Sequence, residues 1–253
     1  MHIRAAIAAA LLSCVAAPSC GQAPAPDVAA AVAAPDRSNG MRELDASRKP
    51  AEVLQFLGLK QGDRALDLFG SNAYWGLILA RSVGTQGSVD AWEAANFLDA
   101  KTKESWDQRH SKIPNLQLIV SPAAAIELPE KTYDFVMFNQ DYHDLYWESD
   151  EYKFPRMDPK PFIAALYRAM KPGGILGVID HVANPGGDTR QVAQALHRID
   201  PATVRSDFEA AGFVLEAESP LLRNLADDHK KNVFDPAIRL HTDRIVYRFR
   251  KPA

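Results

Sequence analysis

The chain has 253 residues, of which 47% are hydrophobic and 24% are charged, as in an ordinary soluble globular protein. This length favours a single domain. The formal net charge of −3 gives no basic surface of the kind that attracts nucleic acids or anionic membranes, so neither is an expected partner. The cysteines are Cys14 and Cys20, and a domain that begins near residue 40 therefore contains no cysteine nucleophile, disulfide or cysteine metal ligand.

The N-terminal segment, residues 1–21, is typical of an export signal. His2 and Arg4 give it a short basic start, and the apolar run over 5–17 is too short to cross a membrane as a helix. The alternative is an Ala-rich helix of the folded domain, but the run offers no polar face. We therefore expect a protein exported to the periplasmic side of a Gram-negative envelope.

Lipid modification is a further expectation for this segment. The sequence Leu-Leu-Ser-Cys that ends at Cys14 resembles the site at which bacterial lipoproteins are acylated, and the sequence that ends at Cys20 is a second candidate. Cleavage without acylation, after a small residue such as Ala25 or Ala34, stays open. The expected product is a periplasmic protein or an envelope lipoprotein with a possible lipid anchor to the membrane.

Two regions follow the signal. Residues 22–40 are rich in alanine and proline without periodicity, which predicts a flexible linker, and residues 41–253 form one predicted domain. Predicted strands cover 65–69, 87–93, 115–120, 132–138, 175–180, 213–217 and 245–250, and predicted helices cover 41–59, 74–83, 94–111, 159–170, 189–198 and 201–211. This alternation ends in two strands without a helical period between them. It predicts an α/β fold with a Rossmann-like doubly wound sheet of seven strands, the last antiparallel.

The stretch 64–81 is predicted to be a strand, a tight turn and a helix, which is the arrangement that binds nucleotide-type cofactors in open α/β sheets. The strand delivers Asp67 to the crevice, where a buried acid organises the turn through backbone N–H groups. The helix that follows begins with unpaired N–H groups. The turn residues expected beside the cofactor are Gly70, Ser71, Asn72 and Ala73.

An acid at the end of the next strand completes this predicted cofactor edge. Glu93 is expected to accept hydrogen bonds from both hydroxyl groups of a ribose, as acids at this position do in nucleotide-binding folds. The alternative is a solvated acid at a strand end. Asp90 is the competing acid, but the alternation of the strand places it in the middle.

Five stretches of the domain resemble one superfamily, the class I S-adenosylmethionine-dependent methyltransferases, and more narrowly the exported, predicted methyltransferase-like proteins of proteobacteria. These stretches are 48–54, 142–146, 170–174, 180–181 and 242–249. The most specific of them contains Lys-Pro-Gly-Gly before an apolar strand. The resemblance covers nearly all of the predicted domain. It implies a seven-stranded sheet with the last strand antiparallel, S-adenosylmethionine as cofactor and methyl transfer to a small molecule.

The resemblance also implies which residues lie beside the cofactor, among them Asn139 at the end of the fourth strand. The class has glycines where this chain has Phe69, Ser71 and Ala73, so that only Gly70 is a glycine within the turn. Such glycines accept positive φ angles and let the backbone approach the methionine part of the cofactor. The substitutions keep an alternative open, a catalytically degenerate protein of this fold that binds a small molecule in the envelope. A different chemistry on the same scaffold is a third possibility.

The loop over 139–147 is where this class carries out its chemistry, because the loop faces the methyl group. Asp141, His143 and Asp144 are predicted to form a carboxylate–imidazole pair, with His143 as general base. The alternative is that the aromatic side chains of the loop pack as a lid, with His143 as its hydrogen-bonded edge. His181, at the end of the fifth strand, is a second candidate base across the same crevice.

Metal binding is the less favoured interpretation of these two histidines. Together with Asp141 or Asp180 they offer ligand atoms, but no tight ligand spacing supports a site, and no metal is expected. His197, His229 and His241 lie in polar surroundings and are predicted to be surface residues.

Overall fold

The computed structural model describes residues 26–253. The predicted export signal, with Cys14, Cys20 and the possible cleavage position Ala25, lies outside the described residues, so export and acylation stay predictions. Among the described helices, none combines the length and the apolar character needed to cross a membrane.

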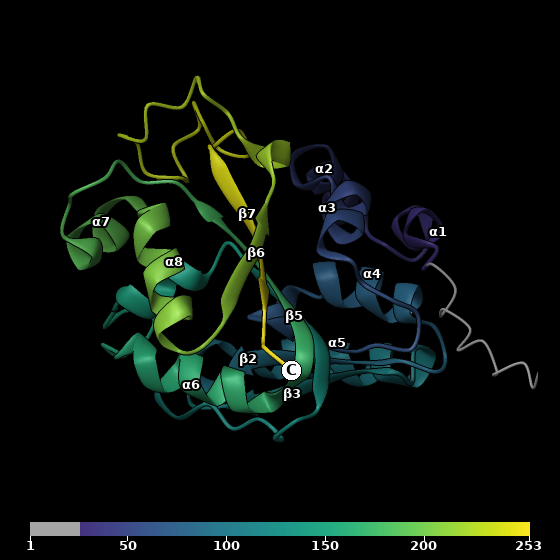
Figure 1. The fold of residues 1–253 in the computed structure, drawn as a ribbon. Helices are drawn as coiled ribbons and strands as arrows, with labels where there is room; N and C mark the ends of the chain where they lie inside the picture. Colours follow the sequence, from purple (N-terminus) through teal and green to yellow (C-terminus); the bar gives the residue numbers. More distant parts are fainter. Residues whose placement is uncertain (1–25) are drawn as a thin grey trace, which may run out of the picture.

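The described chain forms a seven-stranded sheet in the order β3-β2-β1-β4-β5-β7-β6 (Figure 1). Its strands are β1 (Arg64–Leu68), β2 (Ser88–Ala94), β3 (Leu116–Ser121), β4 (Tyr133–Asn139), β5 (Met170–His181), β6 (Val214–Glu218) and β7 (Arg244–Arg250). The neighbours from β3 to β5 are parallel, whereas β7 runs antiparallel to both β5 and β6. The predicted sheet, with its last strand antiparallel, is confirmed.

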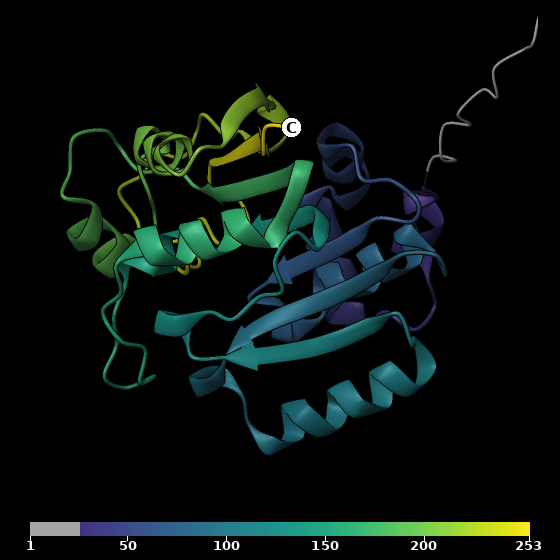
Figure 2. The same ribbon diagram turned by 60° about the horizontal axis from the view of Figure 1, so that its bottom comes forward.

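Helices cover both faces of this sheet. They are α1 (Val28–Ala33), α2 (Asn39–Arg48), α3 (Pro50–Leu57), α4 (Tyr74–Val83), α5 (Ala100–Lys112), α6 (Pro159–Ala169), α7 (Thr189–Leu196) and α8 (Pro201–Ala210). Successive residues of β1 point to opposite faces: Ala65 packs with α3 and α4, and Leu66 packs with α6 and α8. Figure 2 shows α5 and α6 on opposite sides of the sheet. Because both faces are covered, the central strands are nearly continuous apolar runs.

The described part of the predicted linker over 22–40 is folded, which corrects that prediction. Asp27 caps α1 by accepting a hydrogen bond from the Ala30 N–H at 2.9 Å. Val28 and Ala31 are buried in the core cluster that contains α4. The segment lacks sequence periodicity because α1 has fewer than two full turns, and small side chains let it lie close to the neighbouring helix. The folded domain therefore includes α1.

The predicted helix over 41–59 is two helices, α2 and α3, separated at Lys49. Lys49 has a left-handed conformation (φ 45°, ψ 55°), and Pro50 is the first residue of α3. A proline disfavours the right-handed helical conformation in the residue before it, so the chain turns at this point. The turn leaves Arg48 as the last residue of α2, where its side chain lines a cavity at one edge of the sheet.

Candidate functional site

A cavity of about 530 Å³ lies at the carboxyl ends of β1, β4 and β5. Ligands of open α/β sheets bind at this edge, and small-molecule sites typically have volumes of about 300–1,000 Å³. Most of the candidates singled out in the sequence line this cavity, namely Asp67, Gly70, Asn72, Asn139, Asp141, His143, Asp144 and His181. Ser71, Ala73 and Glu93 are not among its lining residues.

Asp67 holds the turn after β1 in place. Its side chain is buried and accepts a hydrogen bond from the Gly76 N–H in α4. Gly70 is required beside it, because a Cβ atom at this position would lie 2.7 Å from Asp67 Oδ2. Burial raises the pKa of Asp67 to about 7, although the Gly76 hydrogen bond and the Arg48 charge both oppose this shift.

The residues that replace two of the glycines keep the left-handed backbone of a glycine-rich turn. Phe69 has φ 53° and Ala73 has φ 59°. A left-handed conformation costs a residue other than glycine about 1–2 kcal/mol. The Phe69 ring offsets this cost by packing into the core, edge-on to Trp92 at 5.0 Å and stacked with Phe138 at 6.0 Å. Phe69, Gly70 and Asn72 of this turn line the cavity.

Glu93 is buried and is not among the residues that line the cavity, which differs from its predicted position beside a ribose. The side chain is buried, with Oε2 accepting a hydrogen bond from the Ser71 N–H at 3.2 Å and Oε1 accepting one from the Ala94 N–H at 2.9 Å. Burial raises the pKa of Glu93. The competing acid, Asp90, accepts a hydrogen bond from the Tyr133 hydroxyl at 2.7 Å. In this structure Glu93 supports the turn rather than a ligand.

The histidine of the loop after β4 pairs with a carboxylate that the sequence did not assign to it. The loop contains the short helix η4 (Tyr142–Tyr146). His143 Nδ1 lies 2.7 Å from Asp180 Oδ1, and the His143 N–H donates to Asp180 Oδ2 at 2.8 Å. Burial opposes protonation, but Asp180 and Asp144 together raise the pKa of His143 to about 9. Asp141 makes no hydrogen bond through its carboxylate to any described residue, and burial raises its pKa well above the usual range.

The aromatic residues of the same loop agree only in part with the alternative interpretation, in which they form a lid. Tyr142 is fully buried, and its hydroxyl donates a hydrogen bond to Asp207 at 2.6 Å. The Tyr146 hydroxyl donates to the same carboxylate. Trp147 lines the cavity instead. The loop thus combines a packed aromatic cluster with a histidine that faces the cavity, so the two interpretations describe different residues of one loop.

His181 differs from His143 in its charge environment. Its Nδ1 lies 2.7 Å from the Thr242 hydroxyl oxygen. Burial lowers the pKa of His181 well below its usual value, and the charge of His143 acts in the same direction. The cavity therefore contains one histidine that favours the protonated form and one that favours the neutral form.

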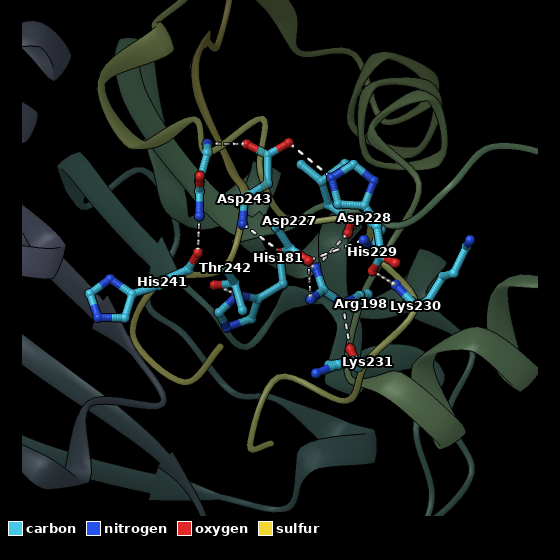
Figure 3. A network of polar contacts seen from close by, with 12 residues as sticks. His181, Arg198, Asp227, Asp228, His229, Lys230, Lys231, His241, Thr242 and Asp243 are labelled. Atoms are coloured by element: carbon cyan, nitrogen blue, oxygen red, sulfur yellow. Dashed lines mark hydrogen bonds and ion pairs between the residues drawn. The ribbon is translucent and has the colours of Figure 1, made fainter. Parts of the chain in front are cut away.

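The long segment over 219–243, between β6 and β7, supplies part of the cavity wall. This contribution to the site was not predicted from the sequence. Val233 and Phe234 line the cavity. A polar network fixes this segment to the sheet (Figure 3), in which the Arg198 guanidinium lies 2.9 Å from Asp227 Oδ2. Asp227 also accepts hydrogen bonds from the backbone N–H groups of His229 and Asp243.

Two further lining residues were not recognised as site residues. Arg48 ends α2, and its guanidinium lies 4.4 Å from the centre of the Tyr74 ring. It has no hydrogen-bond or ion-pair partner among residues 26–253. His197, predicted to be a surface residue, lies beside Trp147 and Phe234 on the cavity wall. The Lys-Pro step after Arg48 is a signal that could have revealed the first, but nothing local marks His197.

Comparisons with known proteins define the fold. No family model matches the chain. It is 20% identical to the structure of a SAM-dependent methyltransferase from Aquifex aeolicus, with a TM-score of 0.57 over 84% of this chain and 97% of that one. The chain has the class I S-adenosylmethionine-dependent methyltransferase fold. The [4+2]-cyclase SpnF has the same fold, with a TM-score of 0.58, 19% identity and coverage of 82% and 81%, so this fold alone does not fix the reaction.

A third structure and two curated proteins are also similar. The Burkholderia thailandensis 1,6-didemethyltoxoflavin-N1-methyltransferase, solved with 1,6-didemethyltoxoflavin and S-adenosylhomocysteine, has a TM-score of 0.53, 15% identity and coverage of 94% and 95%. Demethylmenaquinone methyltransferases from Listeria welshimeri and a Geobacillus species are 22% and 24% identical over 129 and 140 residues. These matches cover 51% and 55% of this chain, and 49% and 54% of the relatives. The chain thus spans about half the length of these relatives.

Proposed function

We propose that the protein transfers a methyl group from S-adenosylmethionine to a small molecule. The observation that carries this proposal is a cavity, at the ligand-binding edge of a methyltransferase fold, in which two groups of opposite charge have no hydrogen-bond partner within the described chain. Arg48 and the Asp141 carboxylate line this cavity without a hydrogen bond to any described residue. Half-buried groups of opposite charge that line one cavity without a protein hydrogen bond indicate a ligand that carries both charges.

The residues present fit the methionine part of S-adenosylmethionine. When bound, S-adenosylmethionine would supply an electrophilic methyl group. Arg48 would hold the carboxylate of that part, and Asp141 would hold its ammonium group. Asp67, Asp141 and Asp144 line the same cavity, and a positively charged sulfonium ligand would oppose the effect of burial, which raises the pKa of Asp67 and Asp141. Glu93 is not among the residues that would hold it, because its carboxylate is bound to the turn.

The aromatic part of the cavity lining fits an acceptor with a flat, apolar ring. Phe97, Trp147, Tyr152 and Phe234 line it. Trp147 and Tyr152 lie with ring centres 6.0 Å apart, and aromatic side chains favour stacked or edge-on contacts with ring-shaped ligands. Holding donor and acceptor together in a closed site would supply most of the catalysis. The names of the methyltransferases with similar sequence or structure agree with this reaction class.

Calorimetric titration with S-adenosylhomocysteine tests the proposal. We expect the wild-type protein to bind it, and Arg48→Met to weaken binding by about tenfold or more. A charge-assisted hydrogen bond contributes about 1.5–3 kcal/mol, and about 1.4 kcal/mol corresponds to tenfold in affinity. Arg42→Met on the same helix is the matched control, because Arg42 contacts Ala34 and does not line the cavity. Absence of wild-type binding at millimolar ligand would contradict the proposal.

A further inference from the structure

Three side chains on the cavity wall place cation-ligating atoms close together. They are His143 and Asp144 on η4 and His197 after α7, and their ligand atoms all lie within 4.8 Å of one another. Asp144 Oδ1 lies 3.3 Å from His143 Nε2 and 3.5 Å from His197 Nδ1. We propose that these three atoms bind a divalent transition-metal ion with an open coordination position toward the cavity.

The spacing of these atoms fits a shared ion better than direct hydrogen bonds. Asp144 Oδ1 is buried, yet it has no hydrogen-bond partner among the described residues. In a tetrahedral site with metal–ligand bonds of about 2.0–2.2 Å, neighbouring ligand atoms lie about 3.3–3.6 Å apart. Both separations from Asp144 Oδ1 agree with this range. An ion held by all three side chains would satisfy the buried oxygen.

Asp180 orients His143 in the way that a second carboxylate commonly orients a metal-binding histidine. Asp180 is fully buried, and its Oδ1 lies 2.7 Å from His143 Nδ1. The backbone N–H groups of His143 and His181 hold the Asp180 carboxylate in place, at 2.8 Å and 2.7 Å. Metal binding would displace the proton on Nε2, which lies on the side of Asp144, while the proton on Nδ1 stays directed to Asp180. Such partners fix the ring orientation and make the histidine a better ligand.

His197 is held beside this pair by ring contacts. Its ring centre lies 5.5 Å from that of Trp147, 5.0 Å from that of Phe234 and 5.4 Å from that of His143. Its left-handed backbone, with φ 51°, ends α7 next to η4. Two segments separated by fifty residues of chain therefore converge on one point, and both histidines have contacts outside the site.

The donor set indicates the class of metal. Two imidazoles and one carboxylate suit ions such as Zn²⁺, Fe²⁺ or Ni²⁺, whereas Mg²⁺ and Ca²⁺ prefer oxygen ligands alone. Three protein ligands leave a position for water or for an oxygen or nitrogen atom of a substrate. Because the site is defined by His143, Asp144 and His197 alone, it does not depend on the identity of the methyl donor.

Metal titration of the protein, purified without a histidine tag and treated with a chelator, tests this site. We expect one equivalent of Zn²⁺ to bind in calorimetry and one equivalent of Co²⁺ to give visible absorption bands. Asp144→Asn and His197→Gln should each weaken Zn²⁺ binding by at least about tenfold, with unchanged circular dichroism. The exposed His241 supplies the control, since His241→Gln should leave Zn²⁺ affinity unchanged.

Three results would overturn the proposal. The first is a wild-type protein that binds no equivalent of Zn²⁺, and the second is Zn²⁺ affinity that survives both Asp144→Asn and His197→Gln. The third is displacement of bound Zn²⁺ by millimolar Mg²⁺, which would contradict the assigned class of metal. Each is read from binding alone, so none depends on catalytic activity.

Discussion

Replacing Asp227 by Asn is expected to lower the free energy of unfolding by about 3–5 kcal/mol, because the change leaves a buried cation without its counter-charge. The Arg198 and Asp227 side chains are 0% and 1% exposed and form an ion pair at 2.9 Å. For a chain of this size, such a loss corresponds to a fall in melting temperature of at least about 6 °C. Denaturant unfolding followed by circular dichroism measures it.

The neighbouring acid provides a matched control for this prediction. Asp228 is exposed, so Asp228→Asn should change the free energy of unfolding by no more than about 0.5 kcal/mol. Replacing the whole pair, with Arg198→Met and Asp227→Leu together, should not recover the loss, because the His229 and Asp243 N–H groups would lose their acceptor and the Val182 and Lys231 carbonyls their donor. A loss below about 1 kcal/mol in Asp227→Asn would show that the ion pair does not anchor the segment over 219–243 as described.

Replacing Phe69 by glycine is expected to destabilise the protein by about 1.5–5 kcal/mol, although it would give the turn a typical glycine motif. The gain from relieving a left-handed phenylalanine is about 1–2 kcal/mol. The loss from removing a ring that packs on Trp92 and Phe138 is about 3–5 kcal/mol, and the added freedom of the unfolded chain costs about 0.5–1 kcal/mol more. Packing therefore outweighs backbone strain.

Ala73→Gly separates these two contributions. Ala73 has the same left-handed backbone but only a methyl side chain, so its replacement should change the free energy of unfolding by no more than about 1 kcal/mol. Thermal unfolding of the two variants beside wild type makes the comparison. Equal stability of Phe69→Gly and wild type would mean that the ring contributes little to the core.

The fold could be predicted from the sequence because its strands are apolar runs bounded by turn residues. The antiparallel place of β7 followed from the absence of a helical period before it. Predictions of helices were wrong where contacts with other parts of the fold, rather than the hydrophobic pattern of the segment, determine its conformation. Val28 and Ala31 pack in the core cluster that contains α4. Lys49 separates α2 from α3, although the residues on both sides of it are helical.

The site could be predicted in part, because strand ends fix where side chains lie but not what they bind. The sequence placed Asp67 and His181 at the carboxyl edge of the sheet, where the structure has them. It could not show that the Glu93 carboxylate accepts a hydrogen bond from the Ser71 N–H. Nor could it show that the Arg198–Asp227 pair fixes the segment over 219–243, which carries Phe234 to His197.

Photolabelling tests most directly whether this cavity binds the methyl donor. The protein would be irradiated with S-adenosylmethionine that carries tritium on its methyl group, then digested, and the labelled peptides sequenced. Our account predicts label within 64–75 or 139–147, the segments that line the cavity from β1 and β4, and its loss when S-adenosylhomocysteine competes. Label confined to peptides away from the cavity, or label that S-adenosylhomocysteine does not reduce, would contradict it.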